Sequence, residues 1–532
     1  MNLAKQIRAI MGLAALLGLA ACGGGGSSSN GSTGGGGPTG AVPVDVTVVG
    51  SITGFGSVWV NGTKYEVASD TRVSIEDEAE RMGDDSQLRL GMVVRMSAVD
   101  NNGVRTARSI EVDEDLKGPI ESITPNANDL TIGTFSVMSQ IVTVDGGTVF
   151  DDDIGNNDGV AGIDFRDLQV GMVVEVNGFP TEGGFLATRV DRELDGLGGN
   201  PDVGRPDVDG DELELKGFVE SIADDESSLV VSGVTFALTP GTIFEDGLAL
   251  GSELIGMFVE IKADIVGGSY MTVRIQAEDS LDDDDRNGEF EIEGVLQSVN
   301  TDATPNTFTI NGITVPVSNA SPLTALVGMR VEIKGSFNGD GVLVMREAEQ
   351  DLEDNVRTED LVSSVNVGGI SFTTRLGLTI SPAGGSGVED KTSDDGDHLT
   401  PEQFINRLQM GDRIEARGND LSASGVSWTR IERDEIAADN DDFECELRGT
   451  VDSIDGDASS FSFVIQGITV LTGRVTENNF QDANDLGIGK AEFFDRLQTG
   501  DVVAAESFEG NEYCMTGTLD AREVEFEPAD AS

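Results

Sequence analysis

One arginine recurs near the end of each of six repeated segments, and it is the most regular polar residue of the chain. The chain has only 34 basic residues against 96 acidic ones, so a repeated cation needs a physical reason. A guanidinium group forms strong, bidentate ion pairs with carboxylates, and glutamates such as Glu111, Glu193, Glu278, Glu347, Glu432 and Glu525 lie close by in sequence. We therefore predict a structural role, with a row of anion-binding sites as the alternative. The six residues are Arg108, Arg189, Arg274, Arg346, Arg430 and Arg522.

Acidic linkers separate several repeats, and one resembles half of a calcium loop. Asp283, Asp285 and Asn287 stand at alternate positions before Gly288, the arrangement in which oxygen ligands wrap Ca²⁺ and glycine permits the sharp turn. The second half is missing, because Gly294 stands where a bidentate glutamate is needed. Calcium is the one cofactor that the sequence suggests, and a solvated acidic linker is the alternative.

Two cysteines, Cys445 and Cys514, lie near the two ends of the last repeat. In an oxidising compartment such a pair predicts a disulfide, which would stabilise the repeat by roughly 4 kcal/mol in the chain-entropy model. Two free buried thiols are the alternative.

Catalytic chemistry has few residues to use. His398 is the single histidine, so a Ser-His-Asp triad or a histidine-rich zinc site would depend on it alone. Carboxylate pairs are too numerous to be informative. We therefore predict no catalytic residues and a protein that is not an enzyme, and keep a carbohydrate-active enzyme using an Asp/Glu pair as an alternative.

The composition also limits the partners. A formal net charge of -62 repels phosphate groups, and aromatic residues make up only 5% of the chain, so neither counterion release nor base stacking favours nucleic acid. A protein or polysaccharide of the cell envelope remains a candidate partner.

The positioning elements are β-strands. Residues 294–348 show the shortest repeat: alternating apolar residues, two runs joined by Asn311-Gly312, and two further strands. Five strands per repeat are expected. Tight turns between strands two and three are predicted at Asn61-Gly62, Ile132-Gly133, Ser232-Gly233, Asn311-Gly312, Gly368-Gly369 and Gln466-Gly467.

Strand one of each repeat follows the pattern Gly, any residue, aliphatic, any residue, Ser, aliphatic, and Asp360 replaces the glycine in the fifth copy. In later repeats the connector before strand four is predicted to be helical: Thr400 is an N-cap, and Gln403 completes a capping box. The predicted units are repeat 1 (46–115), repeat 2 (116–195), an acidic linker (196–212), repeat 3 (213–280), an acidic linker (281–289), repeat 4 (290–351), repeat 5 (352–436) and repeat 6 (437–532).

The first residues are typical of a secretory signal. Lys5 and Arg8 precede an apolar run that is too short to span a bilayer of ~30 Å. Leu19-Ala20-Ala21-Cys22 resembles the lipobox of bacterial lipoproteins, which implies a signal peptide over 1–21 and acyl chains on Cys22. By the same resemblance, Gly23 rather than Asp implies the outer membrane, and residues 22–45 form the lipidated cysteine and a Gly/Ser tether.

A small barrel with a helix between its third and fourth strands resembles the OB-fold. With the lipobox, the array is similar to the tandem OB-like domains of unknown function in secreted bacterial lipoproteins. The expected fold class is all-β, with six tandem five-stranded barrels. We expect a lipid-anchored protein on the periplasmic or surface-exposed face of the outer membrane, with a structural, adhesive or binding role; a calcium-binding surface array is an alternative.

Overall fold

The computed structural model describes residues 43–527 apart from short gaps. The gaps are 76–79, 113–114, 127–130, 153–163, 194–212, 246, 279–280, 282–285, 287, 351–353, 384, 394–395, 421–424, 436–442, 456–460, 483–485 and 511. Cys22, Asp283, Asp285 and Asn287 lie outside the described residues. Among the residues described, no helix has the length and apolar character needed to cross a membrane.

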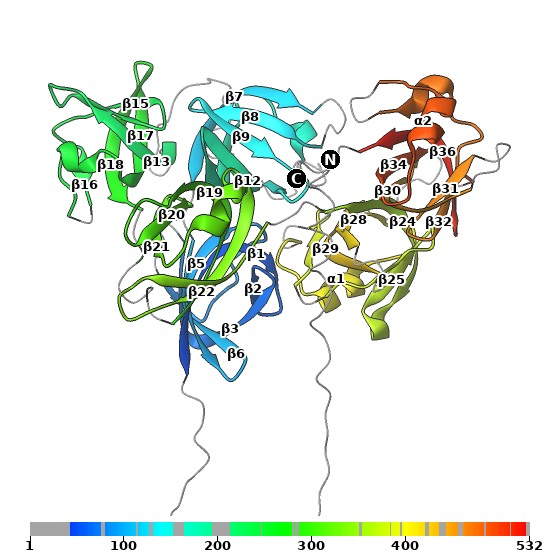
Figure 1. The fold of residues 1–532 in the computed structure, drawn as a ribbon, viewed down its shortest axis with the longest axis horizontal. Helices are drawn as coiled ribbons and strands as arrows, with labels where there is room; N and C mark the ends of the chain where they lie inside the picture. The colour runs from blue at the N-terminus through cyan, green and yellow to red at the C-terminus, as the bar shows by residue number, and fades with distance from the viewer. Residues whose placement is uncertain are drawn as a thin grey trace, which may run out of the picture. The chain divides into compact units, whose positions relative to one another are not determined.

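The described residues form six small β-barrels, numbered here in chain order and coloured from blue to red in Figure 1. The first three consist of the following elements. Barrel 1 contains β1 (Val44–Gly54), β2 (Val58–Val60), β3 (Thr63–Ile75), β4 (Arg81–Met82), β5 (Val93–Asn101) and β6 (Val104–Val112). Barrel 2 contains β7 (Leu116–Pro125), β8 (Gly133–Val137), β9 (Gln140–Val144), β10 (Val149–Asp152), η1 (Phe165–Asp167), β11 (Val173–Thr181) and β12 (Gly184–Glu193). Barrel 3 contains β13 (Leu213–Ile222), β14 (Ser228–Val231), β15 (Val234–Ala237), β16 (Ile243–Phe244), η3 (Ser252–Leu254), β17 (Phe258–Val266) and β18 (Ser269–Ala277).

The remaining three barrels follow the same order. Barrel 4 contains β19 (Glu289–Asn300), β20 (Asn306–Ile310), β21 (Ile313–Val317), η4 (Ser321–Leu326), β22 (Arg330–Phe337) and β23 (Leu343–Gln350). Barrel 5 contains β24 (Val356–Asn366), η5 (Val367–Gly369), β25 (Ser371–Thr374), β26 (Thr379–Ile380), β27 (Gly387–Asp390), α1 (Pro401–Arg407), β28 (Arg413–Asp420) and β29 (Val426–Glu435). Barrel 6 contains β30 (Glu446–Asp455), β31 (Ser462–Ile465), β32 (Ile468–Leu471), η7 (Glu477–Asn479), β33 (Phe480–Gln481), α2 (Lys490–Arg496), β34 (Val502–Ser507), β35 (Cys514–Met515) and β36 (Thr518–Phe526).

Barrel 2 shows the strand order of the fold. Strand one (β7) pairs antiparallel with strand two (β8), which pairs with β9. β9 and β10 together make strand three and run parallel to strand five (β12), which pairs with strand four (β11); β11 then returns to β7. This order, 1-2-3-5-4-1, with a helical connector between strands three and four, is that of an OB-like barrel. The predicted fold class is confirmed.

The predicted connector helix begins where the sequence indicates. The Thr400 hydroxyl accepts a hydrogen bond from the Gln403 backbone N–H at 3.2 Å, and the Gln403 side chain accepts one from the Thr400 N–H at 2.8 Å. This reciprocal capping box satisfies two donors at the start of α1. Phe404 and Ile405 are then buried in the core of barrel 5.

Four of the six predicted turns join strands two and three, and two predictions were wrong. In barrel 2 the turn is Met138-Ser139, both with positive φ, and the Ser139 N–H donates to Glu121 at 2.9 Å. In barrel 5 Gly368-Gly369 lies between strands one and two, where the Asn366 side chain accepts from the Gly369 N–H. The barrel 5 turn is 375–378, with Gly377 at φ +99°. The positions of glycine did not predict these two turns. In barrel 2 two non-glycine residues adopt the left-handed conformation, and in barrel 5 the Gly-Gly pair lies in a short segment capped by the Asn366 side chain.

A hydroxyl residue holds the break in strand three. Thr148 accepts from the Asp145 N–H at 3.2 Å and donates to the Ala187 carbonyl of strand five at 2.8 Å. Thr71, Thr242 and Ser386 make the same two bonds in barrels 1, 3 and 5. The hydroxyl thus replaces the ladder bonds that the interrupted strand cannot make.

The barrels are joined in pairs through their first strands. β1 pairs in parallel with β19, β7 pairs antiparallel with β13, and β24 pairs antiparallel with β30. The result is three continuous sheets, which combine barrels 1 and 4, barrels 2 and 3, and barrels 5 and 6.

Each of these three junctions also contains an ion pair between the two barrels. Arg105 lies 3.2 Å from Glu289, Lys216 lies 3.8 Å from Asp115, and Arg357 lies 3.6 Å from Glu446. Main-chain pairing and partly buried charge therefore act together at every junction.

We predict that Thr148→Val lowers the stability of barrel 2 by about 1–3 kcal/mol, because the change leaves a buried donor and a buried acceptor without their partner. Thr314→Val is the control, since the Thr314 hydroxyl is exposed and contacts only the Thr309 hydroxyl at 3.2 Å. Hydrogen exchange measured by mass spectrometry should show faster exchange in barrel 2 for the first variant. Equal, small effects of both changes would contradict the role given to Thr148.

Candidate functional site: the bulge of strand five

Each barrel has a β-bulge at the same place in strand five. The register with strand four skips one residue there, so that two residues of strand five oppose one of strand four. The residue opposite the bulge is small in every barrel: Ala98, Gly178, Ala263, Gly335, Gly418 and Ser507. In barrel 2 there is no room even for a Cβ atom, which on Gly178 would lie 2.4 Å from the Leu186 carbonyl oxygen.

The bulge divides the six arginines into two classes. Arg108, Arg346 and Arg522 are the skipped residues themselves, and their side chains are 52%, 58% and 38% exposed. Arg189, Arg274 and Arg430 come one residue later, and their side chains are 3%, 20% and 9% exposed. One residue of offset therefore turns the same side chain outward or inward.

The outward arginines pair with an acid at the start of strand one. Arg108 lies 2.7 Å from Asp45, Arg346 lies 3.7 Å from Glu289, and Arg522 lies 3.3 Å from Glu444. Each acid stands five residues before its strand-one glycine: Gly50, Gly294 and Gly449. The partner is thus fixed by the barrel and not by neighbouring sequence.

The inward arginines pair with an acid on strand three. Arg189 lies 2.6 Å from Asp151, Arg274 lies 3.9 Å from Glu245, and Arg430 lies 2.9 Å from Glu389. Each acid stands three residues after the hydroxyl residue that holds the break, namely Thr148, Thr242 or Ser386. Of the acids expected from sequence, Glu432 does pair with its arginine, Arg430, whereas Glu278 pairs with Lys216 at 3.8 Å.

Arg189 and Arg430 each lie among buried carboxylates, and the charges shift one another's pKa within each cluster. Burial opposes the charge of Arg189, but the carboxylates of Asp191, Asp397 and Asp151 outweigh it and hold the pKa of Arg189 well above its ordinary value. Burial, followed by the nearby Glu432 carboxylate, raises the pKa of Glu389 to about 7.

Two of the three inward arginines, Arg189 and Arg430, also reach another barrel. Arg189 donates to the Leu90 carbonyl of barrel 1 at 3.1 Å and to Asp397 of barrel 5 at 3.0 Å. Arg430 donates to the Gly147 carbonyl of barrel 2 at 2.9 Å. Arg189 and Arg430 therefore form contacts between repeats.

His398 of barrel 5 also contacts barrel 1. Its ring stacks on Phe55 of barrel 1 with 4.0 Å between ring centroids, and Nε2 lies 2.9 Å from the Asp85 carbonyl oxygen. His398 therefore takes part in a contact between barrels 5 and 1.

A cavity of about 1130 Å³ lies between the barrels and has a mixed charged lining. Its arginines are already paired: Arg330 with Glu293, Arg357 with Glu415 at 3.1 Å, and Arg448 with Glu527 at 3.7 Å. Neutralised guanidinium groups give the lining no excess positive charge for an anion. Within the part of the chain that the structure describes, no group of three or more His, Cys, Asp or Glu side chains is arranged to hold a metal.

Comparison with protein families assigns five of these barrels to one family. A family described as a domain of unknown function, DUF5666, matches residues 47–111, 117–191, 216–276, 293–347 and 448–525, together more than half of the chain. The chain belongs to the DUF5666 family. No curated protein matches it. Barrel 5 falls outside the five matches, and its strand three differs: among the described strands, β26 pairs only with β25, and β27 alone pairs with strand five (β29).

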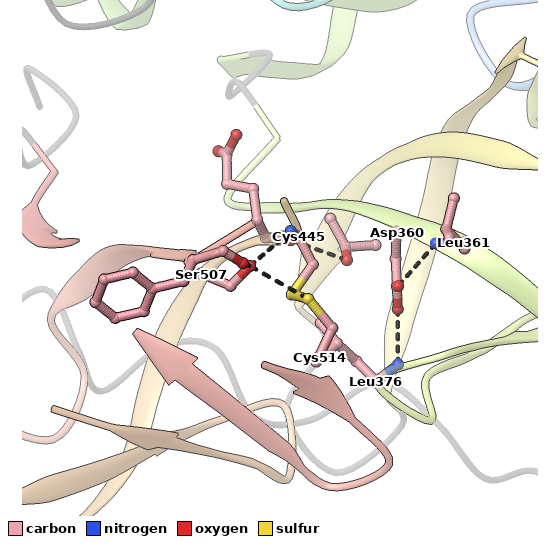
Figure 2. Close-up of a disulfide and its surroundings, with 9 residues drawn as sticks. Asp360, Leu361, Leu376, Cys445, Ser507 and Cys514 are labelled. Atoms are coloured by element: carbon pink, nitrogen blue, oxygen red, sulfur yellow. Dashed lines mark hydrogen bonds between the residues drawn. A yellow bond between two sulfur atoms is a disulfide. The ribbon is translucent and has the colours of Figure 1, made fainter. Parts of the chain in front are cut away.

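Barrel 5 differs from the matched DUF5666 barrels at the strand-one glycine. In barrel 4, the Asn311 side chain of the turn fills the space above Gly294 and donates to the Glu293 carbonyl at 2.7 Å. In barrel 5 the turn is longer, and the fully buried Asp360 carboxylate occupies the position instead, accepting from the backbone N–H groups of Leu361 at 2.7 Å and Leu376 at 2.8 Å (Figure 2).

Cys445 and Cys514 are joined in a disulfide in the core of the last DUF5666 barrel, with a Cα–Cα distance of 6.2 Å (Figure 2). The Ser507 hydroxyl lies 3.2 Å from the Cys514 sulfur and also accepts from the Cys445 N–H at 2.9 Å. Leu361 and Leu376 of barrel 5 belong to the same apolar cluster. The disulfide therefore stabilises the end of the array where barrels 5 and 6 share a core.

We predict that Arg430→Met destabilises barrel 5 by about 3–5 kcal/mol, because it removes the cation that pairs with buried Glu389 and leaves Glu432 with Lys391 alone. The matched control, Arg346→Met, should change barrel 4 by less than about 0.5 kcal/mol, since its side chain faces solvent. Hydrogen exchange resolved by barrel measures both. Similar losses in the two variants would contradict the division set by the bulge.

We predict a pH dependence of barrel 5 from Asp360. Burial raises its pKa to about 6, against hydrogen bonds that lower it. The native state then binds a proton that the unfolded chain has lost, so this contribution is full below about pH 3.8 and disappears as the pH rises through 6, by up to about 3 kcal/mol. Urea unfolding followed by Trp428 fluorescence, with Trp59 replaced by Phe, should show the decline. Asp360→Asn should make the decline shallower by this amount and leave the share of Glu389, whose pKa is also raised, whereas Asp302→Asn, at an exposed loop position, should leave the decline unchanged. A decline that is equally steep in Asp360→Asn would assign it to another group.

Proposed function

We propose that the protein is a lipid-anchored protein of the cell envelope whose tandem DUF5666 barrels serve a structural, adhesive or binding role. The observation that carries the proposal is the lipobox-like Leu19-Ala20-Ala21-Cys22, which follows a short apolar run and precedes a Gly/Ser-rich stretch. The described barrels begin directly after that stretch, with β1 at Val44.

The composition of the first residues supports an anchor. The stretch between Cys22 and the first barrel is rich in Gly and Ser, which is the composition of linkers. Acyl chains contribute about 0.8 kcal/mol per buried methylene, so several chains on one cysteine give stable attachment.

The geometry of the barrels supports a scaffold. Strand-one pairing and an ion pair reinforce each of the three two-barrel units. Two of the three inward arginines, Arg189 and Arg430, are occupied by carboxylates and by carbonyl groups of other barrels, which leaves little of their charge for an anionic ligand. Polar groups used in this way contribute to rigid assembly of the repeats.

We predict that Cys22→Ser releases the protein from membranes, because the hydroxyl cannot accept the thioether-linked lipid. Fractionation of cells into soluble and membrane material, followed by immunoblotting, measures the change. Gly23→Asp is the informative control: it keeps the cysteine, so membrane attachment should persist while the protein moves from outer to inner membrane fractions. Recovery of Cys22→Ser in the membrane pellet would overturn the anchor.

A further inference from the structure

An apolar residue precedes the strand-four glycine in five of the six barrels. We call this side chain the knob; the residues are Leu90, Val170, Ile255, Val327 and Met410, and barrel 6 has Thr499 instead. The glycine that follows takes positive φ in every barrel, which forms the tight turn and presents the knob at its tip.

Four knobs are exposed and one is covered. Val170, Ile255, Val327 and Met410 are 65%, 48%, 44% and 72% exposed, whereas Leu90 of barrel 1 is 2% exposed. Since the turn is the same, the difference arises from what lies against Leu90.

Barrel 2 covers Leu90 with its strands three and five, and barrel 5 also approaches it at Gly387, where a Cβ atom would lie 3.7 Å from Leu90 Cδ1. Val149 of β10 joins the buried cluster of barrel 1 that contains Leu90, and the Arg189 side chain donates to the Leu90 carbonyl at 3.1 Å. The Thr188 carbonyl lies so close to Gly91 that a Cβ atom there would approach it to 2.4 Å. We call Val149, Thr188 and Arg189 the acceptor face of barrel 2.

Barrel 3 has the corresponding face, which is more exposed than that of barrel 2 in the part of the chain that the structure describes. Ile243 pairs with Arg274 in the register in which Val149 pairs with Arg189, and Val273 takes the bulge position of Thr188. Val149 is 4% exposed, whereas Ile243 is 53% exposed. The Arg274 side chain is likewise more exposed than that of Arg189, at 20% against 3%.

We propose that the acceptor face of barrel 3, formed by Ile243, Val273 and Arg274, binds an exposed knob of a second copy of this chain. The contact of barrel 1 with barrel 2 supplies the pattern: an apolar side chain packs on the strand-three residue while the inward arginine donates to the knob's carbonyl. The same chain carries both halves of this contact uncovered, the knobs of barrels 2 to 5 and the face of barrel 3.

Different surfaces of the two copies meet in such a contact, so it is heterologous and can continue from copy to copy. The strong negative charge of each copy opposes it at long range, and salt screens that repulsion. Association is therefore weak, concentration-dependent and favoured by ionic strength. It does not depend on the lipid anchor.

The test is sedimentation velocity of the purified full chain carrying Cys22→Ser, over a range of concentrations and at two salt concentrations. The weight-average mass should rise with concentration, more so at high salt. Ile243→Asp should weaken association by about tenfold or more, since a charge replaces the buried apolar contact. Val344→Asp, which places the same charge on an exposed apolar position of barrel 4, should not.

Cross-linking identifies the partner surface. A photoreactive amino acid at position 243, in a mixture of isotopically light and heavy chains, should yield mixed-label peptides that contain Val170, Ile255, Val327 or Met410. Circular dichroism of each variant establishes that it is folded. A chain that stays monomeric at every concentration, association that Ile243→Asp leaves unchanged, or cross-links elsewhere would overturn the proposal.

Discussion

The strand-five bulge is the constraint on which the arrangement of charges depends. It shifts the phase of strand five by one residue, and a strand alternates its faces every residue, so an arginine before or after the shift has opposite surroundings. Arg346 meets Glu289 at the surface, whereas Arg189 is buried among three aspartates and reaches two other barrels. The small residue opposite the bulge is what allows the two strands to approach at that point.

The second organising feature is the pairing of first strands. OB-like barrels leave part of strand one beyond the closed ring, and here each such extension pairs with that of another barrel. Barrel 1 pairs with barrel 4, where Val46 lies opposite Glu289, 243 residues later in the chain, and not with its neighbour in sequence. The partly buried ion pairs at the junctions add specificity, because main-chain pairing alone does not depend on which side chains are present.

Local sequence predicted local structure well. Alternation of apolar residues, the Asn-Gly turns and the capping box of Thr400 each depend on a few adjacent residues, and the fold class followed from them. Whether an arginine faces inward or outward could not be predicted in this way. An arginine one position earlier or later relative to the bulge changes its sequence distance to the next glycine by only one residue. The turn at Met138-Ser139 lacks glycine, and the partners of Arg189 come from residues 90, 151, 191 and 397. Small residues in strand four were the available signal for the bulge.

Because the first strands pair two by two, an array in which every strand one has a partner contains an even number of barrels. With six barrels every strand-one extension has a partner, whereas a chain with five would leave one row of backbone N–H and C=O groups unpaired at a sheet edge. Gain or loss of a single repeat therefore creates an adhesive edge, and gain or loss of a joined pair does not. Barrel 5, which falls outside the family matches, supplies the strand-one partner of barrel 6. Parity, rather than length, is the quantity that a change in repeat number must preserve.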